Sequence, residues 1–556
     1  MPTDPHTANF GRLESISANA LFEVISSGAE YAVIDVREPR VTAREGSLLL
    51  GVVVPFGRLE TRIAALVPRR NTDVIVYDTE DAGLARRAAG RLIDLGYESV
   101  VVLDGGVRAW AEYGHKVQYG GVHVIGQAFG EWVETHSGTP SIDIDEYVAL
   151  LESGTPTVLL DSRPESEFRH HSLPGAIPIP GAELAYRGPE VIRSPDTVVV
   201  VHCAGRTRSI LGAQTLIDAG IPNRVVSLAG GTQAWELSGR RVSRDRTPPL
   251  YIAAGLRTTA RARDAALELA HRFGIHRIRY DEIESLRAES NTRTLYLFDV
   301  RTPEEFVDGH LPGAVSAPSW QLVPWTFRFA ATRNARIVLS DNDEVRAIVV
   351  ASWLTRLGWR EVFVVQDGLA DAPMEFGAEP TAVLESDNDV VRYLSCVELR
   401  TLSTGDSDVT VLDLGSSSAY ASGHIPGALF ALRSRLAEDL GRVPGSGPIV
   451  LTSEDGILAR LAAAEVQNST DRPVLALREG NAGWQREGLS WTGSAPVYFH
   501  PPDDVYGSGW TETDPAVQIA RFREYLDWEL GLAAEVDMDP TSPFVGTVGR
   551  TKGIES

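Results

Sequence analysis

The chain has 556 residues, of which 43% are hydrophobic and 23% are charged, and its formal net charge is −23 at pH 7. At about 100–200 residues per domain, this length predicts about three to five domains. The negative charge argues against broad contact with nucleic acid or with an anionic membrane surface, because both require clustered Lys and Arg.

Cysteine content and the N-terminus indicate the compartment. Cys203 and Cys396 are the only cysteines, so the sequence contains no disulfide framework and favours a reducing environment. The first residues lack the basic start and apolar run of a signal peptide. No apolar stretch approaches the ~20 residues that span a bilayer. We therefore expect a cytoplasmic protein without a membrane partner.

One pattern of apolar runs and turns occurs four times along the chain. Each copy starts with an apolar run that ends at an aspartate: Asp35, Asp161, Asp299 and Asp413. A second apolar run ends 40 to 43 residues later, at Asp78, Cys203, Asp341 and Ser453. An Ala-rich helical stretch, a third apolar run and a Gly-containing turn complete each copy.

Short β-branched runs that alternate with helical stretches predict an α/β fold, in which each domain has a central, mostly parallel sheet with helices on both faces. We expect four tandem domains, arranged as separate beads. Their predicted ranges are residues 12–120, 140–245, 276–372 and 392–495, followed by a helix and tail at 496–556. Connecting helices are expected within 120–142 and 247–276.

The C-terminal segment AVQIARFREYLDWELGL predicts one amphipathic helix that docks on the domains. Its apolar side is expected to contain Ile519, Phe522, Tyr525, Leu526 and Leu530. No ordered structure is expected after Ala533.

Four sequence features together resemble the rhodanese (sulfurtransferase) family. They are an Asp-x-Arg after the first strand, a GHLPGA-type turn, the strand–loop–helix opening at Cys203, and a GG-x-x-AW ending. The resemblance covers most of residues 12–495 and is best in the second repeat. One cysteine-bearing copy among four is similar to the multi-domain bacterial rhodanese-related proteins. The resemblance implies α/β domains and a persulfide-forming cysteine between a strand and a helix.

Cys203 is the candidate nucleophile of the second domain. It ends a buried strand, and a helix is expected to begin near Ser209. Loop N–H groups and the helix N-terminus can form an anion cradle. Cations near a helix N-terminus lower the pKa of a cysteine. The expected substrate-binding residues are Ala204, Gly205, Arg206, Thr207, Arg208 and Ser209.

The expected reaction is sulfur transfer in two covalent steps. The Cys203 thiolate takes the sulfane sulfur of a small-molecule donor such as thiosulfate, and the persulfide passes it to a thiol or to a protein sulfur acceptor. 3-Mercaptopyruvate and low-molecular-weight persulfides remain alternative donors. No Cys/His spacing predicts a metal site, and no cofactor is expected.

The Asp161–Arg163 pair is expected to support the fold. The same pair recurs at Asp35–Arg37 and Asp299–Arg301 in copies that lack the cysteine, although a direct substrate role for Arg163 remains an alternative. Cys396 has no comparable surroundings and is expected to be structural.

Three domains are predicted to be inactive because Asp78, Asp341 and Ser453 replace the nucleophile. An aspartate at this position is expected to accept the loop N–H groups itself and so fill the anion site. These loops have also become acidic and are candidate docking surfaces.

Two classes of alternative function remain. A non-catalytic persulfide carrier or interaction scaffold fits three silent domains. A Cys-dependent phosphatase or an arsenate reductase uses similar loops, but the phosphatase loop has five residues between Cys and Arg, whereas four separate Cys203 from Arg208.

Overall fold

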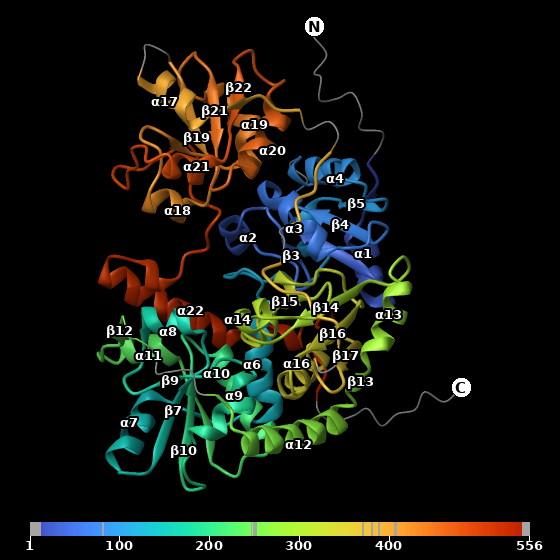
Figure 1. The fold of residues 1–556 in the computed structure, drawn as a ribbon, viewed down its shortest axis with the longest axis vertical. Helices are drawn as coiled ribbons and strands as arrows, with labels where there is room; N and C mark the ends of the chain where they lie inside the picture. Colours follow the sequence, from blue (N-terminus) through green and yellow to red (C-terminus); the bar gives the residue numbers. More distant parts are fainter. Residues whose placement is uncertain are drawn as a thin grey trace.

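The computed structural model describes residues 13–80, 83–245, 247, 253–369, 372–379, 382–386, 390–404 and 408–546. Within these ranges the chain forms four parallel sheets of five or six strands, each flanked by helices (Figure 1). This confirms the predicted α/β class with four repeated domains. None of the helices in the described part of the chain is long and apolar enough to cross a membrane.

Domain 1 has the strand order β1-β5-β4-β2-β3. Its elements are β1 (Ser15–Ile16), α1 (Ala18–Ser27), β2 (Tyr31–Asp35), α2 (Pro39–Glu45), β3 (Val52–Val53), η2 (Phe56–Arg58), α3 (Leu59–Leu66), β4 (Asp73–Tyr77), α4 (Leu84–Asp94), β5 (Val100–Leu103) and α5 (Gly106–Glu112). Along β4, Val74 and Val76 pack with α3 and α4, whereas Ile75 and Tyr77 pack with α1 and α5. Both faces of the sheet are therefore buried, as a continuous apolar run predicts.

Domain 2 repeats this plan with the strand order β6-β11-β10-β7-β9 and an additional antiparallel pair, β8 with β12. Its elements are β6 (Ser141–Ile142), α7 (Ile144–Glu152), β7 (Thr157–Asp161), α8 (Glu165–His170), β8 (His171–Ser172), β9 (Ile177–Pro178), α9 (Glu183–Arg187), η3 (Gly188–Glu190), β10 (Val198–His202), α10 (Thr207–Asp218), β11 (Val225–Leu228), α11 (Gly231–Leu237) and β12 (Ser243–Arg244). The central strand β10 alternates between two apolar clusters, Val198 with Val200 and Val199 with Val201.

Domain 3 has the strand order β13-β17-β16-β14-β15. Its elements are β13 (His276–Ile278), α13 (Tyr280–Ala288), β14 (Leu295–Asp299), α14 (Pro303–Val307), β15 (Val315–Ser316), α15 (Ser319–Leu322), η4 (Thr326–Arg328), β16 (Arg336–Ser340), α16 (Val345–Arg356) and β17 (Glu361–Val365).

Domain 4 adds a sixth strand at the end of the order β18-β22-β21-β19-β20-β23. Its elements are β18 (Tyr393–Leu394), α17 (Cys396–Thr404), β19 (Thr410–Asp413), α18 (Ser417–Ser422), β20 (Leu429–Phe430), α19 (Arg433–Asp439), η5 (Leu440–Arg442), β21 (Ile449–Thr452), α20 (Ile457–Val466), β22 (Val474–Leu477), α21 (Gly480–Arg486) and β23 (Val497–Tyr498).

Two helices connect the domains, as the sequence predicts: α6 (Ile125–Ser137) and α12 (Leu256–Phe273). Close packing of α6 requires glycine at two positions. A Cβ on Gly126 would lie 1.8 Å from the Pro324 carbonyl oxygen, and one on Gly130 would lie 2.8 Å from Cα of Thr207. The helix therefore brings domain 2 and domain 3 together at the start of α10.

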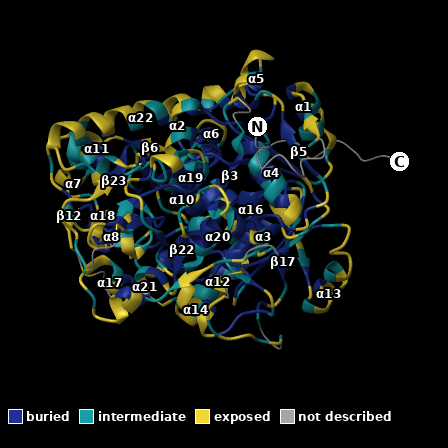
Figure 2. Ribbon diagram, turned by 90° about the horizontal axis from the view of Figure 1, so that it is seen from above, coloured by how far each residue is buried: buried dark blue, intermediate teal, exposed yellow. Residues whose placement is uncertain are grey.

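The domains are not separate beads, contrary to the expectation. One continuous apolar cluster joins residues of domain 1, α6, domain 2, domain 3 and the C-terminal helix, among them Ile63, Phe129, Ile210, Trp353 and Leu532. The repeats carry more apolar surface than their own sheets bury, and this surplus binds neighbouring domains together. Seen from above, the buried residues fill the centre while α5, α22 and α13 present exposed residues at the edge (Figure 2).

Domain 4 has apolar cores of its own and is joined to domain 1 mainly by charge. Arg433 on α19 bonds to Glu60 on α3 at 2.7 Å, and Arg87 on α4 bonds to Glu465 on α20 at 2.6 Å. In Figure 1 domain 4 lies at one end of the molecule next to domain 1, and domain 2 lies at the other end.

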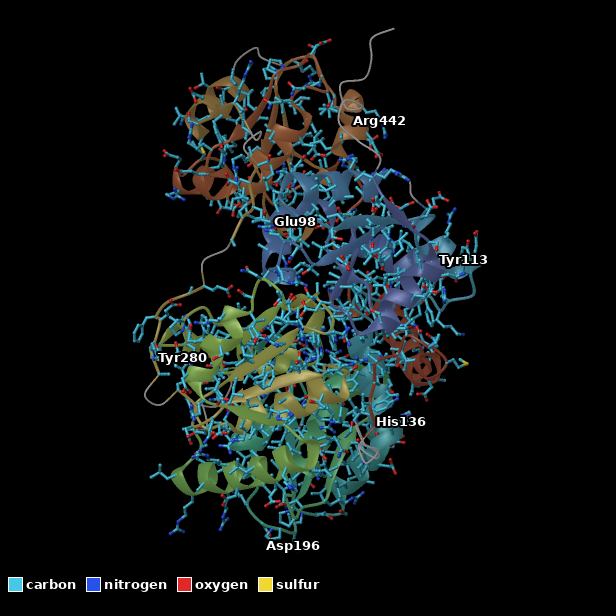
Figure 3. The ribbon with its side chains drawn as sticks, turned by 90° about the vertical axis from the view of Figure 1, so that its right-hand side faces the viewer. Glu98, Tyr113, His136, Asp196, Tyr280 and Arg442 are labelled. Atoms are coloured by element: carbon cyan, nitrogen blue, oxygen red, sulfur yellow. The ribbon has the colours of Figure 1, made fainter. Side chains whose placement is uncertain are left out.

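The C-terminal segment forms η6 (Gly509–Thr511) and the helix α22 (Pro515–Asp537), which packs on α6 and α11. Docking on the domains is therefore confirmed. The C-terminal end of α22 lies next to that of α6: His136 of α6, at the edge of the molecule in Figure 3, is 3.6 Å from Asp537.

Two details predicted for the C-terminal helix and tail are wrong. The buried stripe of α22 runs through Phe522, Glu529, Leu532 and Val536, whereas Leu530 is 57% exposed. Positions seven residues apart share one side of a helix, and the next residue is turned away from it. The chain from Ala533 to Gly546 is also ordered: α22 continues to Asp537, and the following residues reach domain 3, where the Val545 amide donates to the Arg356 carbonyl oxygen at 2.8 Å. Residues 547–556, which the prediction also covered, lie outside the described residues.

Candidate active site around Cys203

Cys203 follows directly after β10, and α10 begins four residues later at Thr207. The loop is held from behind by the Gly-rich turn that precedes α11. The Thr232 amide donates to the Cys203 carbonyl oxygen at 2.9 Å, and a Cβ on Gly231 would lie 2.1 Å from that oxygen. Gly231 also has a φ of +48°, so glycine is required there on two grounds. The GG-x-x-AW motif therefore positions the loop.

The thiol lies in a small cavity and is largely shielded from solvent. Cys203 is 2% exposed, and its Sγ donates to Ser209 Oγ at 3.7 Å. The cavity has a volume of about 60 Å³. One water needs about 10–15 Å³ by this measure, so the space holds about four to six water-sized groups. The cavity is therefore large enough to admit a small anion.

Four parts of the chain enclose this cavity. Its wall is formed by residues 203–208 of domain 2, Gln127 of α6, Pro324 and Trp325 of domain 3, and Tyr525 and Glu529 of α22. The sequence predicts only the first of these contributions. The candidate site is thus completed by segments distant along the chain.

Both predicted substrate-binding arginines are ion-paired within the protein. Arg206 Nε donates to both carboxylate oxygens of Glu131, at 2.9 and 3.0 Å, and Arg206 also pairs with Glu134. Arg208 donates to the two oxygens of Glu167 at 2.6 and 2.9 Å. The net field at the thiol is therefore less positive than the sequence suggests.

The predicted low pKa of Cys203 is wrong for this arrangement. Burial raises the pKa of the thiol above its usual value, and this effect exceeds the lowering by the Arg208 charge and the Ser209 hydroxyl. The Glu529 carboxylate raises the pKa further. Desolvation disfavours the thiolate more than one paired guanidinium can favour it.

Glu529 is a member of the cavity wall that the sequence analysis missed. Its Oε1 accepts from Thr207 Oγ1 at 2.9 Å and from the Tyr525 hydroxyl at 3.1 Å. Its Oε2 is buried without a hydrogen-bond partner in the described part of the chain. That atom would lie 2.7 Å from a Cβ on Gly205, so the loop needs glycine to admit it. One sequence feature could have identified Glu529 as a buried residue. It is a carboxylate seven residues after Phe522, so it lies on the buried stripe of the amphipathic helix.

Asp161 and Arg163 form a buried pair next to the loop. The Arg163 guanidinium donates to Asp161 Oδ1 and Oδ2 at 2.9 and 2.8 Å and to the His171 carbonyl oxygen at 2.6 Å. In domain 1, Arg37 makes the equivalent bond to the Gly46 carbonyl oxygen at 2.7 Å. Neither Asp161 nor Arg163 is among the described residues that line the Cys203 cavity. The pair ties the strand to the following turn.

The replaced positions of the other loops accept N–H groups themselves. Asp341 accepts from the backbone of Glu344 at 2.6 Å and of Arg346 at 2.8 Å. Asp78 accepts from the Ala85 amide at 3.1 Å. The expectation that an aspartate at this position accepts nearby N–H groups is confirmed by these bonds. Residues 81 and 82 of the first loop lie outside the described residues.

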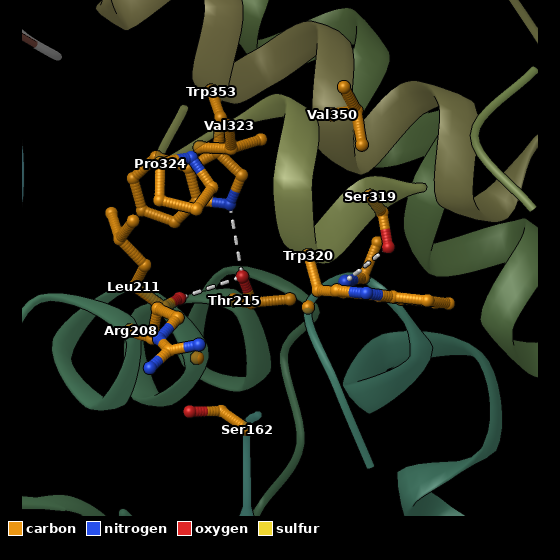
Figure 4. Close-up of a pocket in the computed structure, with 13 residues that line it drawn as sticks. Ser162, Arg208, Leu211, Thr215, Ser319, Trp320, Val323, Pro324, Val350 and Trp353 are labelled. Atoms are coloured by element: carbon orange, nitrogen blue, oxygen red, sulfur yellow. Dashed lines mark hydrogen bonds between the residues drawn. The ribbon is translucent and has the colours of Figure 1, made fainter. Parts of the chain in front are cut away.

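A second cavity of about 30 Å³ lies behind Arg208, between domains 2 and 3 (Figure 4). Trp353 of α16 spans the interface there and donates from Nε1 to Thr215 Oγ1 of α10 at 3.0 Å. The Ala182 amide donates to Ser319 Oγ at 3.1 Å. Domain 3 therefore supports the helix that carries the loop, and the walls of this cavity are mostly apolar.

Comparison with known proteins identifies the family. The profile of the rhodanese-like domain matches residues 20–113, 143–238, 281–372 and 396–487. The chain therefore belongs to the rhodanese-like domain family, with four copies of the domain. No curated protein sequence matches it significantly.

A similar solved structure is the thiosulfate sulfurtransferase from Pseudomonas aeruginosa, with 39% identity over 96% of this chain and 99% of that one and a TM-score of 0.90. The anaerobic ergothioneine biosynthesis enzyme from Chlorobium limicola is 17% identical over 66% of this chain and all of that one, with a TM-score of 0.24. The 3-mercaptopyruvate sulfurtransferase SseA from Escherichia coli is 18% identical over 39% of this chain and 98% of that one, with a TM-score of 0.18. The last two similarities are too weak to support an argument about this chain.

The surroundings of Cys396 differ from those of Cys203. It is 7% exposed within an apolar cluster of domain 4, where it packs with Leu399 and Trp484. No cluster of three or more His, Cys, Asp or Glu side chains in the described ranges is arranged to hold a metal ion.

Proposed function

We propose that the protein is a sulfurtransferase that carries sulfane sulfur as a persulfide on Cys203, with thiosulfate as the donor. The observation that carries the proposal is the thiol itself, enclosed in a cavity of about 60 Å³ at a strand-to-helix loop. Similarity to a thiosulfate sulfurtransferase over 96% of the chain supports the choice of donor.

The reaction starts when Cys203 loses its proton and the thiolate attacks the outer sulfur of thiosulfate. The bond between the two thiosulfate sulfurs breaks, its electron pair leaves with sulfite, and Cys203 holds the persulfide. An acceptor thiolate then attacks the outer persulfide sulfur and releases the Cys203 thiolate. The loop residues 204–208 and Ser209 hold the donor and the persulfide through their backbone N–H groups and the Arg208 charge.

The residues around Cys203 bear on the kind of molecule that accepts the sulfur. Tyr525 and Glu529 of α22 and Trp325 of domain 3 line the cavity, and Cys203 is 2% exposed, so a small thiol reaches the persulfide more readily than a protein acceptor. This favours turnover with small molecules over the carrier and scaffold alternatives. Two buried, separate cysteines suit a reducing cytoplasm.

The decisive test is loading of the purified full-length chain with thiosulfate, followed by intact-mass measurement and peptide mapping. We expect a gain of one sulfur atom per chain, located on Cys203 and matched by released sulfite. A sulfur on Cys396, or no gain with thiosulfate, 3-mercaptopyruvate or a low-molecular-weight persulfide, would contradict the proposal.

The pH dependence of Cys203 provides a second test. Because burial and the Glu529 carboxylate raise the pKa of the thiol, we expect the rate of Cys203 alkylation to keep rising with pH beyond the usual midpoint of a free cysteine. Glu529→Gln removes a negative charge near the thiolate, so the midpoint should move to lower pH.

Glu535→Gln is the matched control, since Glu535 is an exposed residue on the same helix. It should leave the midpoint unchanged. A wild-type midpoint below that of a free cysteine, or equal shifts in the two variants, would show that Glu529 does not act on the thiol.

A further inference from the structure

One cavity in the described part of the chain is separate from the cavity at Cys203. Its volume is about 640 Å³, and it lies between domain 1, domain 3, the end of α12 and residues 540–546. Cavities that hold metabolite-sized ligands have about 300–1,000 Å³ and are common between domains. It shares none of its described lining residues with the Cys203 cavity.

Four arginines line this cavity, in a chain whose net charge is −23: Arg272, Arg333, Arg356 and Arg360. Within the described ranges, Asp218 is the one carboxylate paired with two of them, at 3.2 Å from Arg272 and 3.0 Å from Arg356. Among the described residues, no carboxylate lies within ion-pair distance of Arg333 or Arg360. The wall therefore carries uncompensated positive charge.

The two inner arginines are buried at the cavity wall. Arg333 is 4% exposed and lies 4.5 Å above the ring of Trp359, and Arg356 is 2% exposed. Nη1 of each arginine and Nε1 of Trp359 lack a hydrogen-bond partner in the described part of the chain. Unsatisfied buried donors are costly, and at functional sites they are satisfied by a ligand or by ordered water. Burial lowers the pKa of Arg356 to about 10, as expected when its charge is only partly compensated.

We propose that this cavity binds a small organic polyanion that carries two or more phosphate or sulfonate groups. Planar guanidinium groups match the oxygens of such groups in pairs. The volume exceeds that of one inorganic phosphate and fits a ligand with several charged groups. Arg360 and the half-exposed Arg272 lie at the rim, where they attract an anion before it reaches Arg333 and Arg356.

The test is calorimetric titration with tripolyphosphate at low salt. It uses the full-length Cys203→Ser protein, so that sulfur loading cannot contribute heat. We expect one saturable site per chain. The double variant Arg272→Ala/Arg360→Ala should bind at least tenfold more weakly, because two rim charges are lost.

The matched control is Arg257→Ala/Arg261→Ala, which removes two exposed charges from α12 outside the cavity. It should retain the parent affinity, and thermal unfolding should show that both double variants are folded. Parallel titrations with inorganic phosphate and thiosulfate distinguish phosphate esters from sulfur oxyanions as the natural class. Absence of saturable binding by any of these anions, or equal weakening in the two double variants, would overturn the proposal.

Discussion

Replacing Cys203 with serine should lower the rate of sulfur transfer from thiosulfate to cyanide by at least about 10³-fold, the scale seen when a covalent nucleophile is removed. A serine hydroxyl ionises far less readily than a thiol, and the described cavity wall offers no histidine to act as a base. The Ser209 hydroxyl already donates to the Arg206 carbonyl oxygen at 2.6 Å, so it cannot take over the role of nucleophile. Steady-state production of thiocyanate measures the effect.

Cys396→Ser is the control for this experiment. Cys396 packs in an apolar cluster of domain 4, so its replacement removes the other thiol of the chain without touching the Cys203 cavity. Turnover should be unchanged. Retained activity in Cys203→Ser, or a matching loss in Cys396→Ser, would place the chemistry elsewhere.

Replacing Arg433 with methionine should destabilise the docking of domain 4 by about 3 kcal/mol, the lower end of the cost of breaking a buried ion pair. Arg433 is 3% exposed and donates to both carboxylate oxygens of Glu60, which is fully buried. The charges of Arg433 and Arg91 hold the pKa of Glu60 at about 2. Without Arg433, the Glu60 carboxylate stays buried with Arg91 as its remaining partner, at 2.7 Å.

Arg435→Met is the matched control on the same helix. Arg435 is 43% exposed and lies 3.8 Å from Asp439, and an exposed pair of this kind contributes about 1 kcal/mol or less. Hydrogen exchange should become faster at α19 and α3 in Arg433→Met alone, because their shared interface opens more often. Equal protection in the two variants would mean that the ion pair does not hold domain 4 in place.

Some properties of the site could be predicted from local sequence because they depend on neighbours in the chain. The apolar run before Cys203 and the Ala-rich stretch after it place the thiol between a strand and a helix. The repeated spacing predicts the four sheets. Asp341 illustrates the same rule, since a carboxylate next to a helix start accepts the nearby N–H groups.

Other properties depend on residues that are far apart in the chain. Arg206 pairs with Glu131 of a connecting helix, and Thr207 bonds to Glu529, which lies 322 residues later. No local pattern tells which segment covers a loop. The raised pKa of Cys203 follows from this cover, because desolvation depends on every neighbour of the thiol and not only on the loop that contains it.

The sequence by itself determined the α/β class, the four repeats, the position of Cys203 at a strand end and the existence of a docking C-terminal helix. These follow from periodicity and spacing, which act over a few residues. Only the tertiary structure decided that the first three domains share one apolar cluster, that α22 covers the thiol with Glu529, and that four arginines meet in one cavity. Burial and electrostatic fields are sums over all neighbours in space, so they exist only once the chain has folded.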